Sequence, residues 1–82
     1  MYYVYILKSI KYKNYYTGFT SDLNKRLEYH NKGSNKSTRN YRPYKLVYFE
    51  KISNKSNALK REKQIKRYKG GRAFKKLINN KN

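Results

Sequence analysis

The stretch Tyr2-Tyr3-Val4-Tyr5-Ile6-Leu7, close to the start of the chain, decides the fold. Its residues are aromatic, β-branched or aliphatic, and no polar residue interrupts them. Such a run is typical of a central strand that is covered on both faces. It is too short for the core of a signal peptide, and a membrane-spanning helix needs about 20 residues. We therefore expect a sheet built around residues 2–7, in a cytoplasmic protein with no membrane segment.

A second strand is predicted at residues 15–20, which are aromatic and rich in threonine. The polar stretch 11–14 between the two runs is short, which indicates an antiparallel hairpin. Gly18 lies inside the second run. A glycine in that position marks either a bulge or a close approach of another group to the backbone.

The register of this hairpin decides whether two tyrosines can share a face of the sheet. A loop symmetric about Tyr12 would pair Tyr5 with Phe19. It would also point Tyr16 to the opposite face. A tighter turn, or a bulge at Gly18, would bring Tyr5 and Tyr16 together. The sequence leaves both arrangements open.

The remainder of the chain predicts one further strand and three helices. The first helix is predicted over residues 22–32, with Ser21 as its N-cap, and the strand over 46–49. The second helix begins at Ser53 or Ser56 and runs to about Tyr68, and a short third helix covers residues 72–79. A polar, basic loop over residues 33–43 precedes the third strand, and Pro43 favours an extended Arg42. The order β-β-α-β-α-α forms one domain over residues 1–78, with a frayed tail at 79–82.

The composition limits the classes of protein to which the chain can belong. Its 82 residues allow one small core, and the absence of cysteine excludes disulfides and thiolate metal sites. The 22 lysine and arginine residues against four acidic residues give a net charge of +18. A field of one sign this strong favours a polyanionic partner, and nucleic acid is the first candidate.

Glu62 stands out because of its place on the second predicted helix. Its spacing from Ala58, Leu59 and Ile65 puts it inside their apolar stripe. A carboxylate that faces a core is costly unless it is paired or binds a metal ion. Two interpretations stay open: a metal ligand, or a buried ion pair with one of the many cations.

Arg26 and His30 lie four residues apart on the first predicted helix and border its apolar stripe. They could project together over the edge of the sheet. The alternative is a surface arginine and a half-buried histidine without a role. The few, scattered acidic residues argue against a two-metal site, whereas a single Mg²⁺ needs only one or two carboxylates.

Two tyrosine-containing triplets complete the pattern. Tyr3-Val4-Tyr5 is separated by ten residues from a second triplet, Tyr16-Thr17-Gly18. Arg26 and His30 then come on one helix and Glu62 on a later one. This order resembles the GIY-YIG endonuclease superfamily, in particular a small, stand-alone, single-domain bacterial branch related to the N-terminal domain of the excision-repair nuclease subunit. The stretches 42–48 and 60–62 are also similar to that branch.

The resemblance implies an α+β fold in which helices flank a three-stranded antiparallel sheet. It also implies hydrolysis of a DNA phosphodiester with one divalent ion, Mg²⁺ or Mn²⁺. Tyr5 would activate the attacking water, His30 would assist the movement of the proton, and Tyr16 would hold the water or the phosphate. Arg26 would stabilise charge on the phosphoryl oxygens, and Glu62 would hold the metal ion. Tyrosine is a poor base in water, with a pKa of about 10, and nearby cations would favour its phenolate.

We expect cations of the C-terminal helices and of the basic loop to bind DNA, either duplex or branched. The candidates are Arg39, Arg42, Lys60, Arg61, Lys66, Arg67, Lys69 and Arg72. The predicted function is a metal-dependent endonuclease of DNA repair, recombination or mobile-element processing, to which a partner protein could supply specificity. The alternatives are a non-catalytic nucleic-acid-binding module of the same fold and a small basic ribosome-associated protein.

Overall fold

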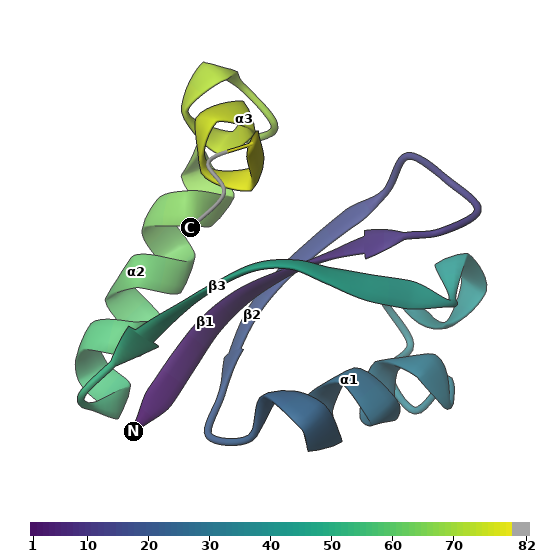
Figure 1. The fold of residues 1–82 in the computed structure, drawn as a ribbon, viewed down its shortest axis with the longest axis horizontal. Coiled ribbons are helices and arrows are strands. Elements are labelled where there is room, and N and C mark those ends of the chain that lie inside the picture. Colours follow the sequence, from purple (N-terminus) through teal and green to yellow (C-terminus); the bar gives the residue numbers. More distant parts are fainter. Residues whose placement is uncertain (80–82) are drawn as a thin grey trace.

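The computed structural model describes residues 1–79, which form three strands and three α-helices (Figure 1). The elements are β1 (Tyr2–Ser9), β2 (Tyr15–Thr20), α1 (Leu23–Asn31), the 3₁₀ turn η1 (Arg39–Tyr41), β3 (Tyr44–Ile52), α2 (Lys55–Arg67) and α3 (Arg72–Asn79). This order confirms the predicted β-β-α-β-α-α arrangement and the α+β class. Asn79, the first residue of the predicted tail, ends α3, and residues 80–82 lie outside the described part of the chain.

β1 is the central strand of an antiparallel sheet with the strand order β2-β1-β3. Residues 4–7 are each 2% exposed or less, because helices pack on both faces of the sheet. The continuous apolar run therefore forms the buried strand that the sequence predicts. β1 continues to Ser9, whose backbone N–H donates to the carbonyl oxygen of Asn14 at 2.9 Å and closes the hairpin turn.

The β1–β2 hairpin places Tyr5 and Tyr16 on the same face of the sheet. Tyr5 pairs with Gly18, and Tyr16 lies two residues before Gly18 on β2, so both side chains point the same way. Of the two registers that the sequence left open, the one that pairs Tyr5 with Phe19 is wrong. The turn is one residue tighter than a loop symmetric about Tyr12. The register between the two strands is uninterrupted, so Gly18 forms no bulge.

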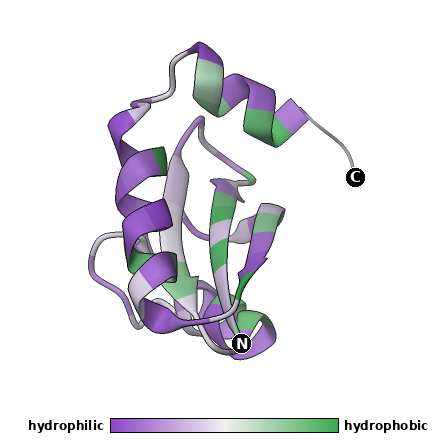
Figure 2. Cartoon of the chain, turned by 90° about the vertical axis from the view of Figure 1, so that its left-hand side faces the viewer, coloured by the Kyte–Doolittle hydropathy of each residue, from purple (hydrophilic) through white to green (hydrophobic). Residues whose placement is uncertain are grey.

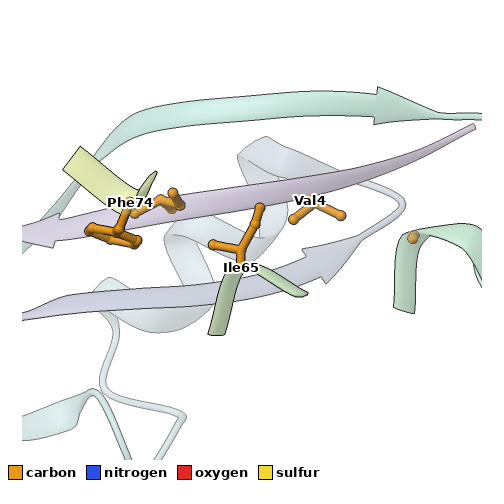
Figure 3. Close-up of a cluster of buried hydrophobic side chains, with 5 residues drawn as sticks. Val4, Ile65 and Phe74 are labelled. Carbon is orange, nitrogen blue, oxygen red and sulfur yellow. The ribbon is translucent and has the colours of Figure 1, made fainter. Parts of the chain in front are cut away.

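Helices form a layer on each face of the sheet, α2 and α3 on one face and α1 on the other (Figure 1). The buried side chains of the first layer are Val4, Ile6, Ala58, Ile65 and Phe74 (Figure 3). The second layer holds Tyr5, Leu7 and Tyr44, against which Leu23 and Leu27 of α1 pack. Because successive residues of β1 point to opposite faces, Tyr5 belongs to the α1 layer and its neighbours to the α2 layer.

The two long helices begin at caps that differ from the predicted ones. Asp22 caps α1 in place of Ser21, and Asn54 caps α2 in place of Ser53 or Ser56. In each case the side-chain oxygen accepts a hydrogen bond from the backbone N–H three residues later, at 3.1 Å for Asp22 and 2.8 Å for Asn54. These bonds satisfy one of the N–H groups that the start of a helix leaves without a partner.

β3 is longer than the predicted strand at 46–49, since it runs from Tyr44 to Ile52. It pairs along the whole of β1, with a register shift where the pairing passes from Ile6 to Leu7. Within the described part of the chain, no helix has the length and apolar character that crossing a membrane requires.

Almost the whole ribbon of α2 is hydrophilic, in contrast to the strands behind it (Figure 2). Only Ala58, Glu62 and Ile65 of this helix are buried. The predicted place of Leu59 in the apolar stripe is wrong, because its side chain is 38% exposed. A stripe this narrow leaves the outer face of α2 to charged side chains.

Candidate active site

A hollow of about 410 Å³ lies at the β2 edge of the sheet, where side chains of both helical layers meet. Four of the five predicted catalytic residues line it: Tyr5 of β1, Tyr16 of β2, Arg26 of α1 and Glu62 of α2. The fifth, His30, lies behind Tyr5. The pocket therefore gathers side chains from two strands and two helices that are far apart in the sequence.

Tyr5 and His30 form a buried pair. The Tyr5 hydroxyl oxygen is 3.0 Å from Nε2 of His30, and the two residues are 2% and 0% exposed. Gly18 makes room for the tyrosine, because a Cβ atom there would lie only 2.6 Å from the Tyr5 hydroxyl. The glycine thus serves the close approach that was one of its two predicted uses. His30 is fully buried, so the half-buried placement that the sequence offered as an alternative is wrong.

Burial changes the proton affinity of both members of this pair. Loss of solvent lowers the pKa of His30 to about 4, and the positive charge of Arg26 contributes to the decrease. Burial also raises the pKa of Tyr5 above its ordinary value, as does Tyr16, and Arg26 only partly opposes this increase. Arg26 thus favours the Tyr5 phenolate, as expected of a nearby cation, but burial outweighs this effect in the protein without bound substrate. At neutral pH the pair consists of a neutral phenol and a neutral imidazole.

Arg26 is oriented by an aromatic neighbour on its own helix. Its guanidinium carbon lies 4.7 Å from the centre of the Tyr29 ring, within the range of a cation–π contact. Tyr29 follows Arg26 by three positions, a spacing that places both side chains on one side of α1. The planar guanidinium thus reaches the pocket with its direction restricted, which suits recognition of a phosphate.

Tyr16 stands between the histidine and α2. Its ring centre is 4.7 Å from that of His30 and 6.3 Å from that of Tyr5. Lys66 Nζ lies 5.8 Å from the centre of the same ring. Tyr16 is partly exposed, so its hydroxyl is accessible to a molecule in the pocket.

Glu62 is the acidic residue of the pocket. It is 9% exposed, as its place in the stripe of α2 predicts, and Nζ of Lys66 lies 3.0 Å from its Oε2. The ion pair that the sequence left open is thus present in the structure. Lys66 is itself half exposed, with 51% of its side chain accessible, so it can move away from the carboxylate.

The donor set of the pocket fits a hydrated Mg²⁺ or Mn²⁺ ion and excludes a fully protein-bound one. Among residues 1–79, no group of three or more His, Cys, Asp or Glu side chains lies close enough together to hold a metal ion. Mg²⁺ commonly binds through one or two carboxylates, several waters and substrate phosphates. Glu62 meets that requirement if Lys66 leaves its oxygen.

The predicted DNA-binding cations differ in whether their side chains already contact groups of the protein. Arg61 contacts Glu50 through Nε and Nη2, the latter at 2.7 Å. In the basic loop, Arg39 Nε donates to the carbonyl oxygen of Gly33, and Arg42 donates to that of Arg39. These three arginines stabilise the fold. Of the other candidates, Lys60, Arg67, Lys69 and Arg72 are exposed along α2, the turn after it and the start of α3, whereas Lys66 is exposed but pairs with Glu62.

A second hollow, of about 810 Å³, lies on the outer face of α2. Lysine and arginine side chains form most of its wall, among them Lys60, Lys63 and Arg67. It holds neither a tyrosine nor a carboxylate. It can contact a polyanion, but the groups with acid–base chemistry are in the smaller pocket at the sheet edge.

Sequence reasoning missed three residues of the site. Lys55 lines the pocket and lies seven positions before Glu62, so two turns of α2 put both on one face. Tyr29 could have been found from its spacing to Arg26. Thr38, whose hydroxyl oxygen lies 2.9 Å from Nδ1 of His30, gave no signal, because the loop brings it there.

The comparisons with known proteins agree with this arrangement. The family model described as the GIY-YIG catalytic domain matches residues 1–76. A UPF0213 protein of Clostridium perfringens is 52% identical over 82% of this chain and 72% of its own length. A UPF0213 protein of Syntrophus aciditrophicus is 48% identical over 79% of this chain and 76% of its own.

A solved structure gives the same result. The solution NMR structure of a UPF0213 protein from Bacillus halodurans matches with a TM-score of 0.58 and 32% identity, over 96% of this chain and 84% of that one. The sequence match, the fold and the convergence of the signature residues on one pocket agree. The chain belongs to the GIY-YIG domain family.

Proposed function

We propose that this protein is a metal-dependent DNA endonuclease whose active site is the pocket at the β2 edge. The observation that carries the proposal is the convergence of two tyrosines, one arginine and one carboxylate on a single hollow. The net charge of +18 supports a polyanionic substrate. A binding module would have no need of a carboxylate beside the phosphate that it binds.

We propose that Arg26 binds the scissile phosphate. Its guanidinium offers two parallel N–H donors to the non-bridging oxygens, and its contact with Tyr29 restricts its direction. Lys55 supplies a second positive charge from the start of α2. Charges held in place before the reaction stabilise the additional negative charge of the transition state.

The proton of the attacking water leaves through Tyr5 and His30. Tyr16 holds the water by its hydroxyl, and the Tyr5 oxygen accepts a proton from that water. The proton that Tyr5 carries passes to Nε2 of His30, 3.0 Å away. The water oxygen forms its bond to phosphorus, the opposite P–O bond breaks, and the leaving oxygen takes up a proton from solvent. This relay never requires a free phenolate, in keeping with the raised pKa of Tyr5.

Glu62 is the residue that would hold Mg²⁺ or Mn²⁺, after Lys66 has left its oxygen. When bound, the ion neutralises charge on the phosphate and its leaving oxygen. Before that, the Lys66 ammonium compensates the charge of the carboxylate, which otherwise would stand unpaired in a largely buried position.

We propose DNA repair, recombination or mobile-element processing as the setting of the reaction. Residues 1–79 measure only 29 × 27 × 22 Å, which leaves little surface to read a long base sequence. DNA of unusual shape, such as a flap or a branch, or a partner protein would then direct cleavage. Direct readout of bases would instead need an element inserted into a groove.

A cleavage assay on a panel of DNA forms tests the proposed function. Single-stranded, duplex, flapped and branched DNA are incubated with the protein and Mg²⁺ or Mn²⁺, and binding is measured in parallel. We expect cleavage of at least one form, and a loss of about a hundredfold or more in Tyr5→Phe. Tyr12→Phe is the matched control, because Tyr12 is exposed and lies outside the pocket. Binding without cleavage of any form would contradict the proposal and favour the non-catalytic module.

A further inference from the structure

Thr38 is a buried polar residue in a loop that is otherwise mostly exposed. It is 0% exposed, although residues 33–43 are polar and basic. Its backbone N–H and its hydroxyl both lie near the carbonyl oxygen of Asn35, at 3.2 and 3.5 Å. The same hydroxyl oxygen is 2.9 Å from Nδ1 of His30. A threonine is therefore packed against the ring whose other nitrogen contacts Tyr5.

These contacts form one chain of polar groups from the loop to the pocket. It runs from the Asn35 carbonyl through the Thr38 hydroxyl and the His30 ring to the Tyr5 hydroxyl. His30 and Thr38 are 0% exposed, so water has little access to the imidazole ring, whereas Tyr5, 2% exposed, borders the pocket. The protein groups themselves must therefore settle which atom carries each hydrogen.

The chain allows two arrangements of its hydrogens, because a neutral imidazole carries one. In the first, Nδ1–H donates to Thr38 and Nε2 accepts from the Tyr5 hydroxyl. In the second, Thr38 donates to Nδ1 and Nε2–H donates to Tyr5. Only the first leaves a lone pair on His30 that can take the proton of Tyr5.

Both ends of the chain favour the first arrangement. The carbonyl oxygen of Asn35 can only accept, so a Thr38 hydrogen directed to it leaves Oγ1 as an acceptor for Nδ1–H. At the other end, His30 Nε2 is the hydrogen-bond partner of the Tyr5 hydroxyl among the described residues. A phenol that donates there satisfies its hydrogen, and the second arrangement would leave that hydrogen without this acceptor.

We propose that Thr38 is a positioning residue that accepts the Nδ1–H of His30 and so holds the histidine in the tautomer whose Nε2 accepts the proton of Tyr5. The loop that follows α1 thus becomes part of the proton relay, although it lies outside the pocket lining. The effect on cleavage rests on the proposed function. The assignment of the tautomer does not, because it concerns the free protein.

The tautomer can be read directly, since His30 is the only histidine of the chain. A long-range ¹H–¹⁵N NMR spectrum of the ¹⁵N-labelled protein at pH 7.5, without DNA, separates a protonated ring nitrogen from an unprotonated one. We expect the signature of a hydrogen on Nδ1 and a lone pair on Nε2. A hydrogen on Nε2 in the wild type would overturn the inference, and that result needs no variant.

Two variants test whether Thr38 is the cause. Thr38→Val keeps the shape of the side chain and removes the hydroxyl, and Thr38→Ser keeps the hydroxyl. We expect the first to mix the two tautomers and the second to preserve the wild-type spectrum. In cleavage assays we expect Thr38→Val to lower kcat about tenfold with little change in KM, and Thr38→Ser to restore it.

The failures of the two proposals can be told apart. An unchanged Nδ1–H tautomer in folded Thr38→Val would overturn the role of Thr38, whatever the cleavage rates. A wild-type protein that shows the expected tautomer but cuts no DNA would contradict the proposed function and would leave the assignment of Thr38 supported.

Discussion

Gly18 is the residue on which the position of Tyr5 depends. A Cβ atom at Gly18 would lie 2.6 Å from the Tyr5 hydroxyl oxygen and 2.8 Å from its Cζ. Because the tyrosine ring is packed in the α1 layer, it cannot swing away freely. We expect Gly18→Ala to lower the free energy of unfolding by about 1–3 kcal/mol, measured by urea denaturation.

A double-mutant cycle with Tyr5→Leu isolates this contact. The shorter leucine lacks the distal ring atoms that the new methyl group would meet. The cost of Gly18→Ala should therefore be smaller in the Tyr5→Leu background, with a coupling free energy of at least about 0.5 kcal/mol. An equal cost in both backgrounds would show that the tyrosine is not the obstacle.

The pKa of His30 gives a second prediction at this scale. The pKa lies at about 4 in the folded protein and at about 6.5 in an unfolded chain. The neutral form is therefore favoured by folding, and the contribution of His30 to stability is lost as the pH falls from about 6.5 to about 4. Titration of the single His30 Cε1–H signal by NMR should have its midpoint near pH 4. A midpoint near 6.5 would mean that the ring is solvated.

The sequence could name the five catalytic candidates because their order along the chain matches the family pattern. It could not supply their surroundings. Thr38 meets His30 only after the loop has folded back on α1. Two opposing effects set the pKa of Tyr5: burial raises it and the positive charge of Arg26 lowers it. Burial is the larger effect. Contacts of this kind are set by tertiary packing, which local spacing does not encode.

At the scale of elements, one ion pair joins the sheet to α2. Glu50 of β3 accepts from Nε and Nη2 of Arg61, and the Tyr48 hydroxyl donates to the same carboxylate at 2.5 Å. A lysine at position 61 would offer Glu50 a single point charge in place of the planar guanidinium of Arg61 with its two donors. We expect Arg61→Lys to lower the free energy of unfolding by about 1 kcal/mol at pH 7, measured by urea denaturation.

The pH dependence and a control sharpen this prediction. Burial opposes ionisation of Glu50, but hydrogen bonds from Arg61 and Tyr48 outweigh it and lower the pKa of Glu50 below 4.5. Stabilisation by the pair is therefore present above pH 4.5 and is lost as the pH falls through the lowered pKa. The cost of Arg61→Lys should shrink in acid. Arg67→Lys, on the exposed face of the same helix, should change little, and an equal cost for both would contradict the assignment.

The bounds of helices and strands were predictable where the spacing of the hydrophobic residues follows a single pattern. β2 and α3 have the predicted bounds, and β1 differs only by its extension to Ser9. β3 was predicted too short, because charged residues such as Lys45 and Lys51 interrupt the apolar pattern while the backbone still pairs with β1. The caps were misplaced because several polar residues adjoin each helix start, and only the three-dimensional path selects Asp22 and Asn54.

At the scale of the whole molecule, the charge predicts how DNA binding responds to salt. Five of the predicted cations are exposed along α2, the turn after it and the start of α3, and Lys55 adds one in the pocket. With about six phosphate contacts, raising the salt concentration fourfold should weaken the affinity about a thousandfold. Fluorescence anisotropy with labelled DNA at several salt concentrations measures the slope. An affinity that does not depend on salt would remove the electrostatic explanation.

The distribution of free charge is the part of this surface that the sequence could not give. Arg39, Arg42 and Arg61 were as strong candidates as their neighbours, yet each donates to a group of its own fold. Composition fixes the total charge of +18, whereas tertiary contacts decide which cations remain for a partner. The composition therefore predicts a polyanionic partner, but it does not predict the binding face.

The most direct measurement of the central claim compares two carboxylates in a single-turnover cleavage assay with Mg²⁺. Glu62→Gln and Glu28→Gln each remove one negative charge from the protein. Glu62 lines the pocket, whereas Glu28 is exposed on α1 and lies outside it. An active site at the β2 edge predicts a loss of about a thousandfold for Glu62→Gln with DNA binding retained, and a wild-type rate for Glu28→Gln. Equal rates for the wild type and both variants would contradict it.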